Sequence, residues 1–263
     1  MKNTEELIIE KDGAICTLTI NNPSKRNALT PNCLAMLTQT FEALSDDSRI
    51  RVVVLRGSGE EAFSAGADIT AMPSRDTRSA ARRSSDPGEA SRAIINYPFP
   101  VIAMLHGYTL GAGCVLAMSC DIRIASKTVK VGIPTSRMGL LSSHQGFKRF
   151  MAVLGFSTAM EIFLTGRSYD SQDCLQMGMV NHLVEPDQVE DYTYQMAKEV
   201  VRCAPLSLRG SKLMMNRIAQ YPELATEDIE KFNALRIEAA TSNDHEEAKS
   251  AFREKRAPIF TGS

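Results

Sequence analysis

The chain has 263 residues, of which 43% are hydrophobic, and its 30 basic and 31 acidic residues give a net charge of -1. This size allows one substantial core with a small appended region. The balanced charge gives no indication of a nucleic-acid or membrane partner. No apolar run approaches the roughly 20 residues that span a bilayer. The mixed-charge start, MKNTEELIIEKDG, is unlike a signal or transit peptide, so we expect a cytoplasmic protein.

The cysteines predict a reduced protein without disulfides or zinc. They lie at positions 16, 33, 114, 120, 174 and 203, form no CxxC pair, and several fall inside apolar runs. The scattered histidines and carboxylates show no metal-ligand spacing, so we expect no metal site.

The first third of the chain reads as alternating strands and helices. LIIEKDGAICTLTINN (7–22) is typical of a hairpin that turns at Asp12-Gly13. Thr30-Pro31 opens an amphipathic helix. RVVVLRGS (51–58) is a continuous apolar strand of the type that is buried on both faces.

The rest of the chain continues this alternation and then becomes helical. The segment 73–92 is polar and arginine-rich, and we expect a mobile helix-loop there. A strand (101–106), a helix (112–120), a strand (121–126) and a loop (132–146) follow, and helices predominate from about 188. This order predicts an α/β fold with much parallel sheet, with a core at 1–187 and a C-terminal helical region at 188–263.

Two turns of small residues are candidates for ligand binding through the backbone. In Ser64-Ala65-Gly66-Ala67-Asp68-Ile69, small side chains after a strand allow a ligand to approach the main chain closely. Leu110-Gly111-Ala112-Gly113 lies at a helix start, where unpaired N–H groups and the helix dipole favour negative charge. Each turn alone could equally reflect tight packing.

Together with three later blocks, these turns resemble a known family. AFSAGADI, HGYTLGAGCVLAMSCDIRIAS, VGIPTSRMGLL, AMEIFLTGRSYDSQDCLQMGMVNHLV and AFREKRAPIF are similar, in order and over nearly the whole chain, to the crotonase superfamily of enoyl-CoA hydratases and isomerases. The resemblance implies a crotonase-like ββα spiral with a C-terminal helical trimerisation region. It also implies homotrimers, often paired as dimers of trimers, and an acyl-CoA thioester as ligand, with no permanently bound cofactor.

The resemblance assigns the thioester site to the two turns. The backbone N–H groups of Ala67 and Ala112 match the family's oxyanion hole, which clamps the thioester oxygen and stabilises an enolate. Coenzyme A contacts carry over to the residues that match the family's CoA-binding segments. These are Lys25, Arg26, Ala28, Ala65, Asp68, Ile69, Phe252 and Lys255.

The chain departs from the family pattern at both catalytic glutamates. In hydratases of this family, one glutamate activates water and the other handles the α-carbon proton. Their positions are occupied here by Val115 and Thr135. Valine cannot transfer a proton, and threonine can only position a water. We therefore expect standard 2-enoyl-CoA hydration to be severely impaired.

Other side chains in the predicted active-site loop could replace the glutamates. Ser143 aligns near a position that carries an aspartate in some members, and its neighbour His144 has a side chain suited to proton transfer near neutral pH. A surface role for His144 is about as consistent with the sequence. His106, Asp121, His182 and His245 are expected to be structural or solvated, with His106 making structural hydrogen bonds, and Tyr108 could face the acyl group or the core.

The sequence thus predicts an acyl-CoA-dependent enzyme of the enoyl-CoA hydratase/isomerase family that is not a standard hydratase. The alternatives are a decarboxylase or thioester hydrolase of the same fold, or a non-catalytic acyl-CoA-binding protein. The arginines at 75–92 could favour an acidic acyl group, although a solvated, mobile surface explains them better.

Overall fold

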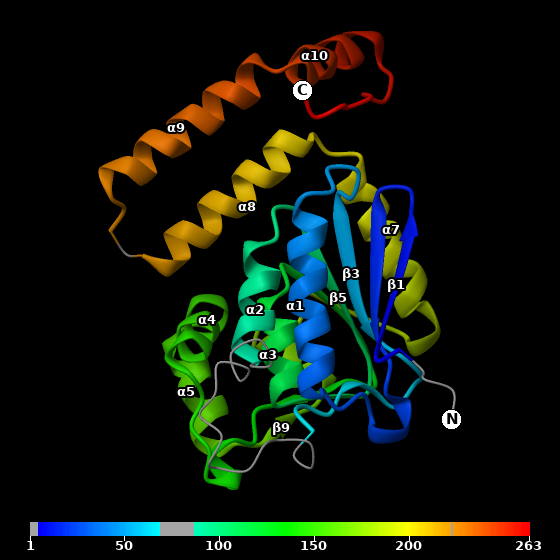
Figure 1. Ribbon diagram of the computed structural model, residues 1–263, viewed down its shortest axis with the longest axis vertical. Helices are drawn as coiled ribbons and strands as arrows, with labels where there is room; N and C mark the ends of the chain where they lie inside the picture. Colours follow the sequence, from blue (N-terminus) through cyan, green and yellow to red (C-terminus); the bar gives the residue numbers. More distant parts are fainter. Residues whose placement is uncertain (1–4, 69–86, 222) are drawn as a thin grey trace.

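The computed structural model describes residues 5–68, 87–221 and 223–263. The expectations for Ile69 and for most of the 73–92 segment therefore lie outside the described residues. Two β-sheets form the centre, with helices on both faces of the larger sheet (Figure 1). The strands are β1 (Leu7–Asp12), β2 (Ile15–Ile20), β3 (Val52–Gly57), β4 (Ala62–Ser64), β5 (Val101–Leu105), β6 (Tyr108–Leu110), β7 (Ile122–Ser126), β8 (Lys130–Gly132), β9 (Ser168–Tyr169) and β10 (His182–Val184).

The helices include the two expected after Thr30-Pro31 and after Gly111, and residues from 189 onward are mainly helical as expected, whereas β9 and β10 interrupt the helices between 146 and 188. The helices are α1 (Pro31–Ser45), α2 (Pro87–Asn96), α3 (Ala112–Ser119), α4 (His144–Leu154), α5 (Phe156–Thr165), α6 (Ser171–Gln176), α7 (Val189–Val201), α8 (Pro205–Gln220), α9 (Thr226–Thr241) and α10 (Asn243–Glu254). Short 3-10 turns lie at Pro23–Lys25, Ser136–Met138 and Pro186–Gln188. The predicted loop at 132–146 is shorter than expected, because Ser143 caps α4 and starts that helix at His144.

The larger sheet has six strands in the order β1-β2-β3-β5-β7-β10. The β1–β2 hairpin is antiparallel, as Asp12-Gly13 predicts, and the other pairs are parallel. The side chains of β3 alternate between two cores: Val53 and Leu55 face α1–α3, whereas Val52 and Val54 face α7. This burial on both faces confirms the interpretation of the continuous apolar run.

The smaller sheet has the order β4-β6-β8-β9 and continues beyond the carboxyl ends of β3 and β5. The β4–β6 and β6–β8 pairs are both parallel, so the segments that follow β4, β6 and β8 leave the smaller sheet at the same edge. The candidate site lies at this edge.

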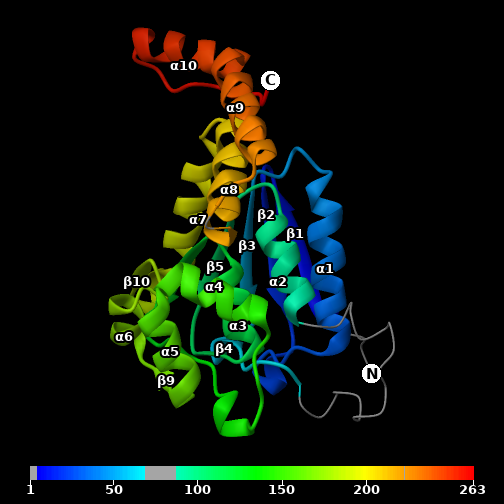
Figure 2. The ribbon, with the colours of Figure 1, turned by 90° about the vertical axis from the view of Figure 1, so that its left-hand side faces the viewer.

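The C-terminal helices extend away from both sheets. α8 packs against α4, α9 packs against α8, and α10 packs against α9 (Figures 1 and 2). α7, in contrast, covers the six-stranded sheet through β2, β3, β5 and β7. The chain therefore leaves the sheet after α7. The predicted boundary between a core at 1–187 and a helical region at 188–263 stays a prediction.

Candidate functional site

The two small-residue turns meet in the folded chain. A Cβ atom on Gly66 would lie 2.9 Å from the carbonyl oxygen of Leu110 and 3.4 Å from the backbone nitrogen of Ala112. A Cβ on Gly113 would lie 2.6 Å from the carbonyl oxygen of Ser64. Only glycine permits this approach of the start of α3 to the end of β4. The fold thus places residues 64–67 and 110–113 against each other.

The backbone around Ala67 leaves its N–H group directed away from its neighbouring strand. Leu29 forms a parallel bridge with Ala67, in which Leu29 N donates to Gly66 O (2.8 Å) and Asp68 N donates to Leu29 O (2.9 Å). These bonds use the groups that flank Ala67. Within the described parts of the chain, no backbone carbonyl accepts from Ala67 N–H.

Ala112 supplies a second N–H group because it is the first residue of α3. Gly111 precedes it with a φ of 51°, and Gly111 N donates to Gly132 O at 2.9 Å. The first N–H groups of a helix have no partner within the helix, and the helix dipole adds partial positive charge there. Two N–H donors on adjacent segments can polarise one carbonyl oxygen.

The far end of α3 is fixed by buried and half-buried cations. Arg149 Nε donates to Met118 O (2.8 Å), and Arg123 Nη1 donates to Cys120 O (2.9 Å). Lys212 Nζ lies 2.7 Å from the Asp121 carboxylate, directly after the helix. Burial lowers the pKa of Lys212. These contacts satisfy carbonyls at the C-terminus of α3 and hold the helix that carries Ala112.

The segment that matches the family's CoA-binding stretch borders the same turn. Lys25 Nζ pairs with Asp68 Oδ2 at 2.9 Å, and Ala65 N donates to Arg26 O at 2.9 Å. Arg26 also pairs with Glu61 and lies over the Tyr108 ring at 5.1 Å. The structure brings Lys25, Arg26, Ala28, Ala65 and Asp68 together with Ala67.

Asn27 holds this segment in place, a role that the sequence analysis missed. Its side chain is fully buried and donates from Nδ2 to Ser58 O (2.9 Å) and Ala62 O (2.7 Å). Ser64 Oγ donates to Asn27 O at 2.8 Å. Asn27 has a φ of 53°, a conformation that asparagine tolerates better than most residues. The only hint in the sequence of this positioning role was the asparagine itself, between Arg26 and Ala28.

Val115 and Thr135 both lie near Ala112. Val115 is one turn further along α3 and is half-buried. The β6–β8 register pairs Leu110 with Gly132, so that Ile133, Pro134 and Thr135 leave the sheet beside Gly111 and Ala112. Thr135 is half-buried.

Ser143 and His144 begin α4 and are both exposed. The Ser143 hydroxyl accepts from Gly146 N at 3.1 Å, so it serves as a helix cap. Among the described residues, His144 has no side-chain hydrogen bond or ion pair. The geometry supports a structural role for Ser143 and leaves the role of His144 a prediction.

Phe252 and Lys255 are not brought to this site within one chain. Phe252 is 86% exposed on α10. The tail that follows α10 contacts the core where Arg51 Nη2 donates to Phe260 O (3.1 Å), directly before β3. The two turns lie beyond the other end of β3, about 20 Å along a six-residue strand. Figures 1 and 2 show α10 at the opposite end of the molecule from β4 and β9.

His106 meets the expectation of structural hydrogen bonds in part, since its backbone carbonyl accepts from Phe63 N at 2.8 Å. It is 9% exposed, and within the described residues its Nε2 atom has no hydrogen-bond partner. Burial and the nearby Arg56 cation lower the pKa of His106.

His182 bonds to the Tyr192 hydroxyl at 3.1 Å, and His245 is exposed, as expected for both. Cys203 is exposed, whereas the other five cysteines are buried and free, as predicted.

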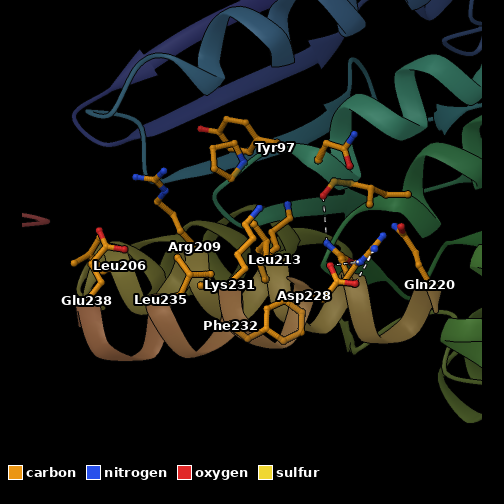
Figure 3. A pocket seen from close by; sticks show the side chains of 17 residues that line it. Tyr97, Leu206, Arg209, Leu213, Gln220, Asp228, Lys231, Phe232, Leu235 and Glu238 are labelled. Carbon is orange, nitrogen blue, oxygen red and sulfur yellow. Dashed lines mark hydrogen bonds and ion pairs between the residues drawn. The ribbon is translucent and has the colours of Figure 1, made fainter. Parts of the chain in front are cut away.

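A groove of about 470 Å³ lies elsewhere, between α8, α9 and residues 95–98 (Figure 3). Its walls include Tyr97, Arg209, Lys231 and Phe232, together with the Arg217–Asp228 ion pair. None of the predicted site residues lines it.

In the part of the chain that the structure describes, no cluster of metal-ligating side chains occurs, and no helix is long and apolar enough to cross a membrane.

Known proteins resemble this chain over nearly its whole length. Residues 10–263 match the family described as enoyl-CoA hydratase/isomerase. The chain is 33% identical to the short-chain-enoyl-CoA hydratase of Clostridium acetobutylicum over 95% of both chains. It is also 33% identical to the 2,3-dehydroadipyl-CoA hydratase of Escherichia coli, covering 98% of this chain and 99% of the relative. A crystal structure of an enoyl-CoA hydratase/carnithine racemase from Magnetospirillum magneticum superposes with a TM-score of 0.91 at 30% identity, covering 99% and 97% of the two chains.

Proposed function

Because the chain belongs to the enoyl-CoA hydratase/isomerase family, we propose that it binds an acyl-CoA thioester and stabilises the derived enolate with the N–H groups of Ala67 and Ala112. The observation that carries this proposal is the approach of Gly66, the residue before Ala67, to the Ala112 nitrogen, which supports a common position for the two donors. A preorganised donor of this kind contributes about 10²–10³ in rate. Lys25, Arg26, Ala28, Ala65 and Asp68 border the site from the side where the CoA moiety would lie.

The reaction is proposed to differ from standard hydration, although the relatives named above are hydratases. Hydration requires a base for water and an acid for the α-carbon, and Val115 and Thr135 supply neither. Decarboxylation of a malonyl-type thioester needs no base to start. The bond from the α-carbon to the carboxylate breaks, CO₂ leaves, and the electron pair forms the thioester enolate, which then takes a proton at the α-carbon.

Two other candidates rest on specific features of the chain. His144 could assist isomerisation or thioester hydrolysis, since it begins α4 with an exposed imidazole. A protein that only binds acyl-CoA would retain the donors and the CoA-binding segment without acid–base groups. Tight binding without turnover across a panel of thioesters would distinguish this last candidate.

We also propose that the protein forms a homotrimer or a dimer of trimers, in which α10 reaches a neighbouring subunit. Phe156 and Leu164 on α5, Ile237 on α9 and Phe252 on α10 are each more than 60% exposed. These exposed apolar side chains on three helices support contacts between copies of the chain. In such an assembly Phe252 and Lys255 would meet the CoA bound by another copy.

The first experiment is to follow loss of the conjugated absorbance of crotonyl-CoA at high enzyme concentration, and then to assay malonyl-type thioesters. We expect little hydration. Ala112→Pro then tests the donor, because proline at the first helical position removes the N–H and keeps the helix. We expect turnover of any substrate found to fall about 10²–10³-fold. Thr226→Pro, at the first position of α9, is the matched control and should leave turnover unchanged.

A further inference from the structure

One face of α3 leads away from the proposed thioester site toward α2 and α4. Ala112, Val115 and Ser119 lie on this face, at spacings of three and four residues. Ser119 is buried, and its hydroxyl hydrogen-bonds with the Ser91 hydroxyl of α2. With a rise of 1.5 Å per residue, Ser119 lies about 10 Å from Ala112 along the helix. Since Ser119 bonds to Ser91, Ser91 and its neighbour Arg92 lie roughly 10 Å along α3 from Ala112.

Arg92 reaches from α2 toward the first turn of α4. Its Nη2 atom lies 3.4 Å from Gln145 Oε1, and its Nη1 atom lies 3.2 Å from Glu89 Oε2. Both contacts are long for charge-assisted or bidentate bonds, and the Arg92 side chain is 49% exposed. Exposed pairs within one helix contribute little free energy, so a second carboxylate can compete for the guanidinium.

The surroundings of Arg92 favour an anion. α4 has 11 residues, and the N-terminal end of its dipole, at His144 and Gln145, adds partial positive charge on the side that Arg92 faces. Glu89 is the counter-charge on the same helix. Between this position and Ala112 stands Val115, whose apolar side chain suits the methylene part of a chain.

We infer that Arg92 is a specificity-determining residue for an acyl-CoA whose acyl chain ends in a carboxylate. The inference rests on the proposed binding of the thioester at Ala67 and Ala112. Five bonds separate the thioester carbon of an adipyl chain from its terminal carboxyl carbon, and an extended chain advances roughly 1.2 Å per bond. The chain therefore spans roughly 6 Å along α3, and the guanidinium closes the remaining distance.

The test compares the dissociation constants of adipyl-CoA and 6-methylheptanoyl-CoA, in which an isopropyl group replaces the carboxylate. Both are saturated and can be titrated calorimetrically into the full-length protein. We expect adipyl-CoA to bind about tenfold more tightly or better at low salt, with a smaller ratio at high salt. Arg92→Gln should bring the ratio near one by weakening adipyl-CoA alone.

Two further variants separate this role from general charge effects. Glu89→Gln removes the competing carboxylate and should increase the ratio. Arg202→Gln, at an exposed arginine that follows α7, should leave the ratio unchanged. A ratio near one in the unmodified protein, or an unchanged ratio in Arg92→Gln, overturns the inference while the proposed function stands. If neither thioester binds, the proposed function fails and the inference falls with it.

Discussion

Lys212 and Asp121 lie 91 positions apart in the chain, yet their charged groups meet at 2.7 Å, directly behind the helix that presents Ala112. Lys212 is 7% exposed and also donates to the carbonyls of Phe99 (2.9 Å) and Ile94 (3.3 Å). All three ammonium protons therefore have acceptors. This single side chain ties α8, the helix that follows α7, to the strands and helices of the site.

We predict that Lys212→Met destabilises the fold strongly. Removing one partner of a buried pair leaves an uncompensated charge, which costs about 3–5 kcal/mol. Urea unfolding monitored by circular dichroism measures this loss. Lys249→Met is the control, since Lys249 pairs with Glu246 at an exposed position and should change stability by less than about 1 kcal/mol. Equal effects of the two variants would contradict the role assigned to Lys212.

The contact between Gly113 and Ser64 gives a second prediction. Gly113→Ala places a Cβ 2.6 Å from the Ser64 carbonyl oxygen, so α3 must move away from β4 and Ala112 from Ala67. We expect at least a tenfold loss of acyl-CoA affinity, measured by titration calorimetry, together with a lower melting temperature.

Gly210→Ala is the matched control for this substitution. Gly210 lies within α8, and a Cβ there would meet nothing within 4 Å. Alanine at this helical position should stabilise the protein by about 0.5–1 kcal/mol and leave affinity unchanged. Full acyl-CoA affinity in Gly113→Ala would show that the spacing of the two turns does not matter for binding.

His106 gives a prediction on pH. Its pKa is lowered in the folded chain by burial and by Arg56, so the unfolded chain binds this proton more readily. The contribution of His106 to stability is therefore complete above its unfolded pKa of about 6.5 and is lost as the pH falls below that value. Unfolding free energies measured between pH 5 and 8 should decline toward pH 5, and His106→Gln should make this decline smaller. An identical pH profile in His106→Gln would refute the assignment.

The elements of the fold could be predicted from local patterns, whereas the contacts that build the site could not. Thr30-Pro31, Asp12-Gly13 and the run at 51–58 encode a helix start, a turn and a buried strand within a few residues each. The burial of Lys212 depends on partners 91 and 113 positions away, and its own helix reads as an ordinary exposed helix.

The site shows the same division. The small residues around Gly66 and Gly111 indicated close backbone approach, but their meeting depends on the β4–β6 pairing. Asn27 was overlooked because its bonds run to Ser58 and Ala62, which are distant in sequence. Phe252 and Lys255 were predicted from the resemblance alone. Within a single chain they lie near the start of β3, whereas the two turns lie beyond its end, and no local sequence pattern indicates this separation.

The last prediction concerns the two positions that depart from the family pattern. Val115 is half-buried on α3, one turn after Ala112, and Thr135 leaves the sheet beside the same residue. The double substitution Val115→Glu with Thr135→Glu places two carboxylates next to the proposed oxyanion donors. Because each acid–base group contributes about 10²–10⁴ in rate, we expect crotonyl-CoA hydration to rise by at least about 10²-fold over the unmodified protein. The single variants are the controls and should gain less, since one carboxylate cannot both activate water and protonate the α-carbon. Rapid hydration by the unmodified protein, with no gain in the double variant, would show that another side chain, such as His144, already performs this proton transfer.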